Sequence, residues 1–146
     1  MKHIYYEGQV LWSQIDANRH LRHSAYADFG AQARTNLMDE SGLTIEEFTK
    51  KLIGPILFKE VLIYHREVLM HETVKVSVEL TKYNHTNSRF SFRHVIYKGD
   101  GIKCATVEVD GAWMDLTKRK LTKVPNDWES IIDAMPKSED YEEITE

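Results

Sequence analysis

The chain has 146 residues, of which 42% are hydrophobic and 29% charged, the balance of a globular domain with one substantial core. No run approaches the ~20 apolar residues of a membrane-spanning helix, and the N-terminal residues lack the apolar stretch of a signal peptide. The formal net charge is −4, but residues 138–146 hold five acidic residues and no basic one, so the remainder is near neutral and gives no indication of nucleic-acid binding.

The first half of the chain predicts one strand and two helices. Aromatic and β-branched residues favour a strand within residues 3–14, and a polar loop follows at 14–22. A capping-box pattern predicts a short helix over about 44–52. Between these segments, a long helix is predicted over about 24–40, because apolar residues recur there at helical spacing: Tyr26, Phe29, Ala33 and Leu37.

The second half of the chain predicts a meander of antiparallel strands. Apolar residues alternate with polar ones over 74–81, which is typical of a strand with one buried face. Two further strands are predicted over about 88–97 and 102–116, joined by a tight turn at 98–101 that contains two glycines. A short helix is predicted over about 127–135.

This order of elements predicts an α+β fold in which one long helix covers one face of an antiparallel sheet. We expect a single domain over residues 1–136 and a frayed acidic tail over 137–146. The sheet edges still need cover, which a homodimer joined edge to edge would supply. Cys104 is the only cysteine and has no internal disulfide partner, so we expect a reducing, cytoplasmic location.

The densest group of chemically active side chains lies in residues 16–26, which span the predicted loop and the start of the long helix. The first N–H groups of a helix have no partner within the helix, and the helix dipole is positive there. A carbonyl oxygen placed at this end is stabilised as it gains negative charge. A nearby carboxylate, Asp16, can attack that carbon or activate a water, so the segment indicates a site for acyl transfer.

The spacing of Asp16-Ala17, His23 and Tyr26, followed by Ala33-Arg34-Thr35, resembles the 4-hydroxybenzoyl-CoA thioesterase superfamily. It is particularly similar to the acyl-CoA thioesterases associated with the Tol-Pal system. The resemblance implies a hot-dog fold, with a long central helix wrapped by an antiparallel sheet, and a thioester hydrolase. It also implies a homodimer, or a homotetramer of two dimers, with the active site at the dimer interface. A thioester has a good leaving group, so we expect neither a metal nor another cofactor.

The resemblance also implies a role for each residue. Asp16 is the catalytic carboxylate, acting either as nucleophile or as general base on water. The N–H of His23 polarises the thioester carbonyl, and its side chain orients Asp16 or the water. Asn18 and His20 resemble the Asn-x-His pair of plant acyl-carrier-protein thioesterases and support the loop or contact the substrate. Tyr26 contacts the substrate or packs in the core. The substrate is an acyl-CoA or an acyl-carrier-protein thioester.

Several alternatives remain open. A hot-dog hydratase carries Asp-x-Asn-Pro-x-His, in which the histidine is five positions after the aspartate. Here His20 is only four positions after Asp16, and the proline is missing. A binding module that holds acyl-CoA without hydrolysing it would use the same pocket. Asp16, His20 and His23 would give a metal three ligands but no evident fourth. The basic residues within 118–123 meet the phosphates of CoA or form a solvated strand end, and Cys104 is expected to be a small core residue.

Overall fold

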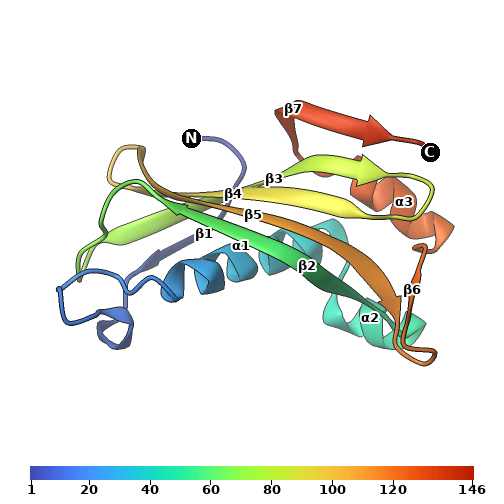
Figure 1. The fold of residues 1–146 in the computed structure, drawn as a ribbon, viewed down its shortest axis with the longest axis horizontal. Coiled ribbons are helices and arrows are strands. Elements are labelled where there is room, and N and C mark those ends of the chain that lie inside the picture. The colour runs from blue at the N-terminus through green and yellow to red at the C-terminus, as the bar shows by residue number, and fades with distance from the viewer. The chain divides into compact units, whose positions relative to one another are not determined.

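Figure 1 shows the fold in a computed structural model that describes residues 1–146. The helices are α1 (Ala25–Ser41), α2 (Ile45–Lys51) and α3 (Asn126–Asp133), with one 3-10 turn at Trp12–Gln14. The strands are β1 (Ile4–Gln9), β2 (Ile53–Tyr64), β3 (Thr73–Asn84), β4 (Phe90–Lys98), β5 (Ile102–Asp115), β6 (Lys120–Thr122) and β7 (Lys137–Ile144). No helix is long and apolar enough to cross a membrane.

The predicted helices and long strands form close to their expected positions, because local signals decide them. The Thr44 hydroxyl accepts a hydrogen bond from the Glu47 N–H at 3.1 Å and starts α2, which ends at Leu52 in the left-handed conformation. Gly99 and Gly101 both take positive φ angles, 54° and 102°, in the turn between β4 and β5. Glycine adopts such angles without a steric cost, so this turn is well specified.

The seven strands form one sheet with the order β1-β3-β4-β5-β2, while β6 pairs with β5 and β7 pairs with β3. By its contacts the chain divides into two compact units. The first unit contains residues 1–36, 61–78 and 93–108, and the second contains the rest. Helix α1 and strands β2 to β5 each continue from one unit into the other along the chain.

The acidic C-terminal segment is a strand, so the prediction of a frayed end is wrong. Strand β7 pairs in parallel with β3, with Leu80 opposite Lys137 and Asn84 opposite Ile144. The His85 N–H donates to the Ile144 carbonyl at 2.8 Å, which extends this pairing past the end of β3. Backbone hydrogen bonds therefore order the segment, while its charged side chains suit an exposed edge that must not pair further. Strand β6 was also not predicted.

The second unit is built around an aromatic cluster. The indole of Trp113 lies 5.4 to 5.8 Å, centroid to centroid, from the rings of Phe48, Phe90 and Trp128. Trp113 and Trp128 are both fully buried. The Trp128 indole N–H donates to the Glu47 carboxylate at 3.1 Å, so helices α2 and α3 are joined by a polar contact as well as by packing.

In the first unit, α1 is held against the sheet by a close approach and a buried polar chain. A Cβ on Gly30 would lie 3.5 to 3.6 Å from Val107 and His94. The fully buried His94 has its Nδ1 2.8 Å from the Val107 carbonyl and its Nε2 3.0 Å from Nη1 of Arg34. Because a guanidinium can only donate, Nε2 accepts and Nδ1 carries the proton. His94 is thus a neutral link between α1, β4 and β5.

This link makes stability depend on pH. Burial, helped by the charge of Arg34, lowers the pKa of His94 to about 3. The unfolded chain binds a proton at this histidine below about pH 6.5, whereas the folded chain does not. The contribution of His94 to the free energy of unfolding is therefore complete above pH 6.5. It falls towards pH 3, with a slope approaching about 1.4 kcal/mol per pH unit. We expect His94→Gln, followed by urea unfolding from pH 7 to pH 4.5, to be less sensitive to acid than wild type. Equal pH dependence in the two proteins would contradict the assignment.

Candidate active site

The loop before α1 is closed on Asp16 by backbone hydrogen bonds. The Asp16 N–H donates to the His20 carbonyl at 2.8 Å, and the Arg19 N–H donates to the Asp16 carbonyl at 3.0 Å. Oδ1 of Asp16 accepts from the N–H groups of Asn18 at 2.8 Å and of His20 at 3.2 Å. Both of these bonds use the same carboxylate oxygen. The carboxylate is thus oriented before any ligand arrives, and Oδ2 remains for a substrate or water.

The start of α1 follows directly and is also fixed. The Arg22 N–H donates to the Gln14 carbonyl at 2.8 Å, and its guanidinium donates to the Ser13 carbonyl at 2.6 Å. The Tyr64 hydroxyl, from β2, donates to the His23 carbonyl at 3.2 Å. The N–H groups of His23 and Ser24 make no hydrogen bond to the backbone. They are therefore available, at the positive end of α1, to an electron-rich oxygen.

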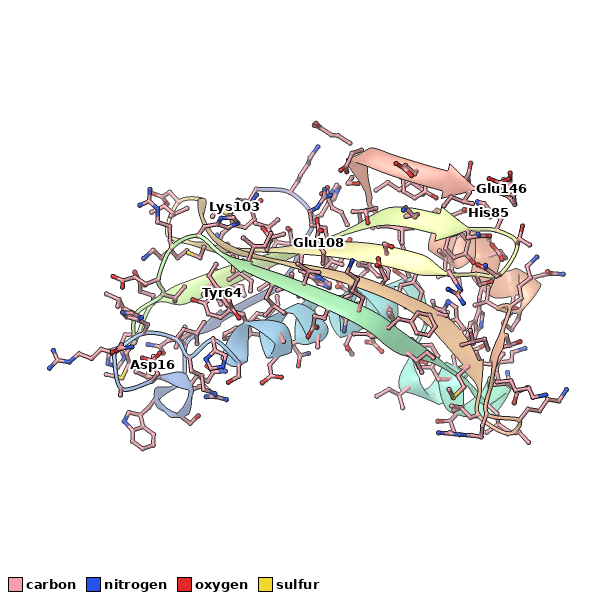
Figure 2. The ribbon with its side chains drawn as sticks, viewed as in Figure 1. Asp16, Tyr64, His85, Lys103, Glu108 and Glu146 are labelled. Carbon is pink, nitrogen blue, oxygen red and sulfur yellow. The ribbon has the colours of Figure 1, made fainter.

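A cavity of about 310 Å³ opens beside these two features, wholly within the first unit. Figure 2 labels two of the residues that line it, Asp16 in the loop before α1 and Tyr64 on β2. Every lining side chain except leucine carries a polar atom. The lining residues are Asp16, His20, Leu21, His23, Tyr26, Tyr64, His65, Arg66 and Glu67.

The wall opposite the loop comes from the end of β2 and the residues after it. The rings of Tyr26 and Tyr64 meet edge to face at 5.1 Å between centroids. Nε2 of His65 lies 3.2 Å from the Thr106 hydroxyl. Burial raises the pKa of Tyr26 to about 12, with smaller contributions that include the charge of Asp16. Tyr26 therefore stays a neutral hydroxyl at physiological pH.

A histidine and a carboxylate face each other across the rim of the cavity. Nε2 of His20 lies 3.0 Å from Oε2 of Glu67, and both side chains are partly exposed to solvent. A carboxylate at this distance holds the proton on Nε2, so that Nδ1 of a neutral His20 is a hydrogen-bond acceptor. The backbone N–H of the same histidine binds Asp16. His20 thus links the carboxylate loop to the opposite wall.

The family of the chain follows from comparison with known proteins. The model of the thioesterase-like superfamily matches residues 10–132. The chain belongs to the thioesterase-like superfamily. This membership confirms the predicted hot-dog fold and the predicted class of enzyme, a thioesterase. A search of curated proteins finds no match.

Several solved structures have the same fold as this chain. A hypothetical protein from Staphylococcus aureus, solved in complex with CoA, is 19% identical with a TM-score of 0.83, covering 91% of this chain and 84% of that chain. A DHNA-CoA thioesterase from Staphylococcus aureus is 18% identical with a TM-score of 0.80, covering 88% and 87%. The probable thioesterase YbaW from Escherichia coli is 18% identical with a TM-score of 0.79, covering 92% and 100%. At such identities the likeness concerns the fold.

The structure brings together most residues that the superfamily resemblance singled out. Asp16, His20, His23 and Tyr26 all line the cavity. Asn18 does not line it and contributes its backbone N–H to Asp16. No hydrogen bond joins the side chains of His23 and Asp16. Asp16, His20 and His23 do not converge as a group of metal ligands.

Sequence reasoning missed the wall formed by residues 64–67. The polar run His65-Arg66-Glu67, which follows the apolar residues at 61–63, was the available signal, since polar residues at the end of an apolar segment often line a site. His65 had no recognisable spacing to the loop because the two segments are brought together only by the fold. The basic residues within 118–123 lie on and beside β6, in the second unit, and do not line this cavity.

Tyr64→Phe tests whether the start of α1 is held from β2. Phenylalanine keeps the ring on Tyr26 but loses the hydrogen bond to the His23 carbonyl. We expect stability to fall by about 1 kcal/mol, and the N–H groups at the start of α1 to exchange faster with solvent. Urea unfolding and amide hydrogen exchange measure the two effects, with Tyr97→Phe as control. Unchanged exchange at the helix start would show that Tyr64 does not position it.

Proposed function

We propose that this protein hydrolyses the thioester of an acyl-CoA, releasing the free acid and CoA, and that Asp16 is the catalytic carboxylate. The observation that carries the proposal is the position of Asp16. Its carboxylate is held by two N–H groups through one oxygen and lies in the same cavity as His23 at the start of α1. A nucleophile or base thus faces a place where a carbonyl oxygen can be stabilised.

The two routes open to Asp16 use the same geometry. The thioester carbonyl oxygen accepts a hydrogen bond from the N–H of His23, which draws electron density from the carbonyl carbon. In one route, Oδ2 of Asp16 attacks that carbon, the C–S bond breaks, CoA leaves as thiolate, and water hydrolyses the resulting anhydride. In the other, Asp16 takes a proton from a water, and the hydroxide attacks and displaces the thiolate. Neither route needs a metal or another cofactor.

The other residues of the cavity fit supporting roles. His20, oriented by Glu67, presents Nδ1 as an acceptor for a water or for a hydroxyl of the substrate. Tyr26, which also lines the cavity, offers a neutral hydroxyl. Arg66 gives the cavity a positive charge that suits an anionic group. We therefore propose that His20 and Tyr26 contact the substrate. Asn18 instead supports the loop, through the hydrogen bond from its N–H to Asp16.

Similar solved structures support CoA as the carrier. One similar protein was solved in complex with CoA, and others are a DHNA-CoA thioesterase and a gentisyl-coenzyme A thioesterase. An acyl-carrier-protein thioester is the alternative substrate. The resemblance to enzymes associated with the Tol-Pal system stays a prediction. The cytoplasm remains the proposed location, since the single cysteine, Cys104, is buried and unpaired.

Asp16→Asn and Asp16→Ala test the catalytic carboxylate. Asparagine keeps an oxygen that can accept from the two N–H groups, whereas alanine removes it, so the first variant separates chemistry from loop structure. We expect both variants to lower kcat for thiol release by roughly 10²- to 10⁴-fold, measured with a thiol-reactive dye on a panel of acyl-CoAs. Asp28→Asn, on an exposed position of the first turn of α1, is the matched control and is expected to match wild type.

The outcomes of this assay separate the competing functions. Wild-type rates in Asp16→Asn would exclude the proposed mechanism. Absence of thiol release from every acyl-CoA would shift the function to hydration of an enoyl thioester, which changes absorbance without freeing thiol, or to an acyl-carrier-protein substrate. Binding of an acyl-CoA with neither reaction would identify a binding module.

We also propose that two chains associate through β2. This strand ends the sheet order, and its exposed apolar residues would aggregate without cover. A second copy pairing with it would continue the sheet and bury these side chains. A homotetramer would require two such dimers to pair. The exposed apolar residues of β2 are Leu57, Phe58, Val61, Ile63 and Tyr64.

Ile63→Glu tests the proposed dimer. Ile63 is 49% exposed, so a charge there is tolerated by a single chain but opposes apolar contact between two copies. We expect light scattering to give a multiple of the 17.1 kDa chain mass for wild type and the single-chain mass for the variant. Ile102→Glu, at a position 46% exposed on β5, is the control and is expected to keep the wild-type mass. A wild-type protein with the mass of one chain would refute the dimer.

A further inference from the structure

We propose that His85, Asp133 and Glu143 bind a divalent transition-metal ion, with Zn²⁺ as the probe that tests the site. The three residues belong to the second unit and come from three elements: the turn after β3, the end of α3, and β7. One nitrogen or oxygen from each lies within 4.8 Å of the others. Figure 2 shows His85 at the end of β3, next to the C-terminal end of β7.

The negative charge of the cluster favours binding of a cation. Glu129 lies one turn before Asp133 on α3, so both carboxylates project from the same face of the helix. The ion pairs of Glu129 and Glu143 both go to His85. Three carboxylates therefore surround one imidazole, and the nearest lysine ammonium, that of Lys137, donates to the backbone carbonyl of Asp133. A divalent ion would remove this repulsion at close range.

Both ring nitrogens of His85 have a carboxylate oxygen within 3.5 Å. Its Nε2 lies 2.5 Å from Oε1 of Glu143, one of the proposed ligands. Its Nδ1 lies 3.5 Å from Oε2 of Glu129. A metal-binding histidine typically donates its second N–H to a carboxylate, which sets the tautomer and the plane of the ring. Here Glu129 is the carboxylate next to Nδ1, and the ion would replace the proton between Nε2 and Glu143.

An independent observation lies beneath the cluster. Tyr83 is fully buried, and its hydroxyl has no hydrogen-bond partner. Its ring meets the imidazole of His85 edge to face, with 5.0 Å between the ring centroids. Oε1 of Glu129 is also buried without a partner. Buried polar atoms without partners are uncommon, and an ion or its bound water is an ordinary reason for them.

The donor set selects the class of ion. One imidazole and two carboxylates suit Zn²⁺ and neighbouring transition metals, whereas Mg²⁺ and Ca²⁺ prefer oxygen ligands alone. A water would complete four-coordination. Since the ligands come from β7, α3 and the turn after β3, the ion would tie the C-terminal strand to its neighbours.

The experiment uses the full chain after treatment with a chelator. Titration calorimetry with ZnCl₂ is expected to show one ion per chain, and Co²⁺ is expected to give the visible absorption of a four-coordinate site. Zn²⁺ is also expected to raise the Tm by several degrees, because it binds only the folded chain tightly. Each of His85→Ala, Asp133→Asn and Glu143→Gln should weaken binding at least 10-fold. Glu129→Gln should weaken it roughly 10- to 100-fold through the orientation of His85.

Matched controls keep the result specific. Glu142→Gln and Asp127→Asn remove exposed carboxylates from the same strand and the same helix, and both should bind Zn²⁺ like wild type. Glu143 is exposed, so Glu143→Gln folds even if His85→Ala does not. Absence of binding by wild type, or equal binding by wild type and Glu143→Gln, would overturn the proposal.

Discussion

The hydrogen bonds that Asp16 accepts from its own loop are the interaction on which the proposed chemistry depends. Two backbone N–H groups hold Oδ1, and the backbone bonds between Asp16 and His20 close the same loop. A carboxylate on a mobile loop would lose most of its advantage, because catalysis requires the reacting atoms to be in place beforehand. The loop therefore supplies orientation, and the helix behind it supplies the electrostatic field.

That field is useful only if α1 begins at a defined point. Several contacts within the first unit define it: Tyr64 holds the His23 carbonyl from β2, and the Arg22 guanidinium holds the Ser13 carbonyl. Farther along, Gly30 permits a close approach to the sheet that His94 then completes with hydrogen bonds. Each contact contributes little alone, but together they hold α1 in place against its neighbours in the first unit.

The two units put their charged side chains to different uses. In the first unit, acidic and basic side chains surround a cavity that can accept a small molecule. In the second, acidic side chains on α3 and β7 converge on His85. The acidic C-terminal segment thus contributes a side chain to this cluster. Strand β7 exposes carboxylates along the edge of the sheet, and one of them, that of Glu143, contacts His85.

Local patterns in the sequence determined the helices, the long strands β3, β4 and β5, and the place of Asp16 before a helix start, because each depends on neighbours within a few residues. The family resemblance then indicated the hot-dog fold. Only the tertiary structure decided that residues 64–67 face Asp16, that the C-terminal segment pairs with β3, and that His85 meets Glu143. These contacts join residues far apart in the chain, and strand order and register, which local periodicity does not encode, bring them together.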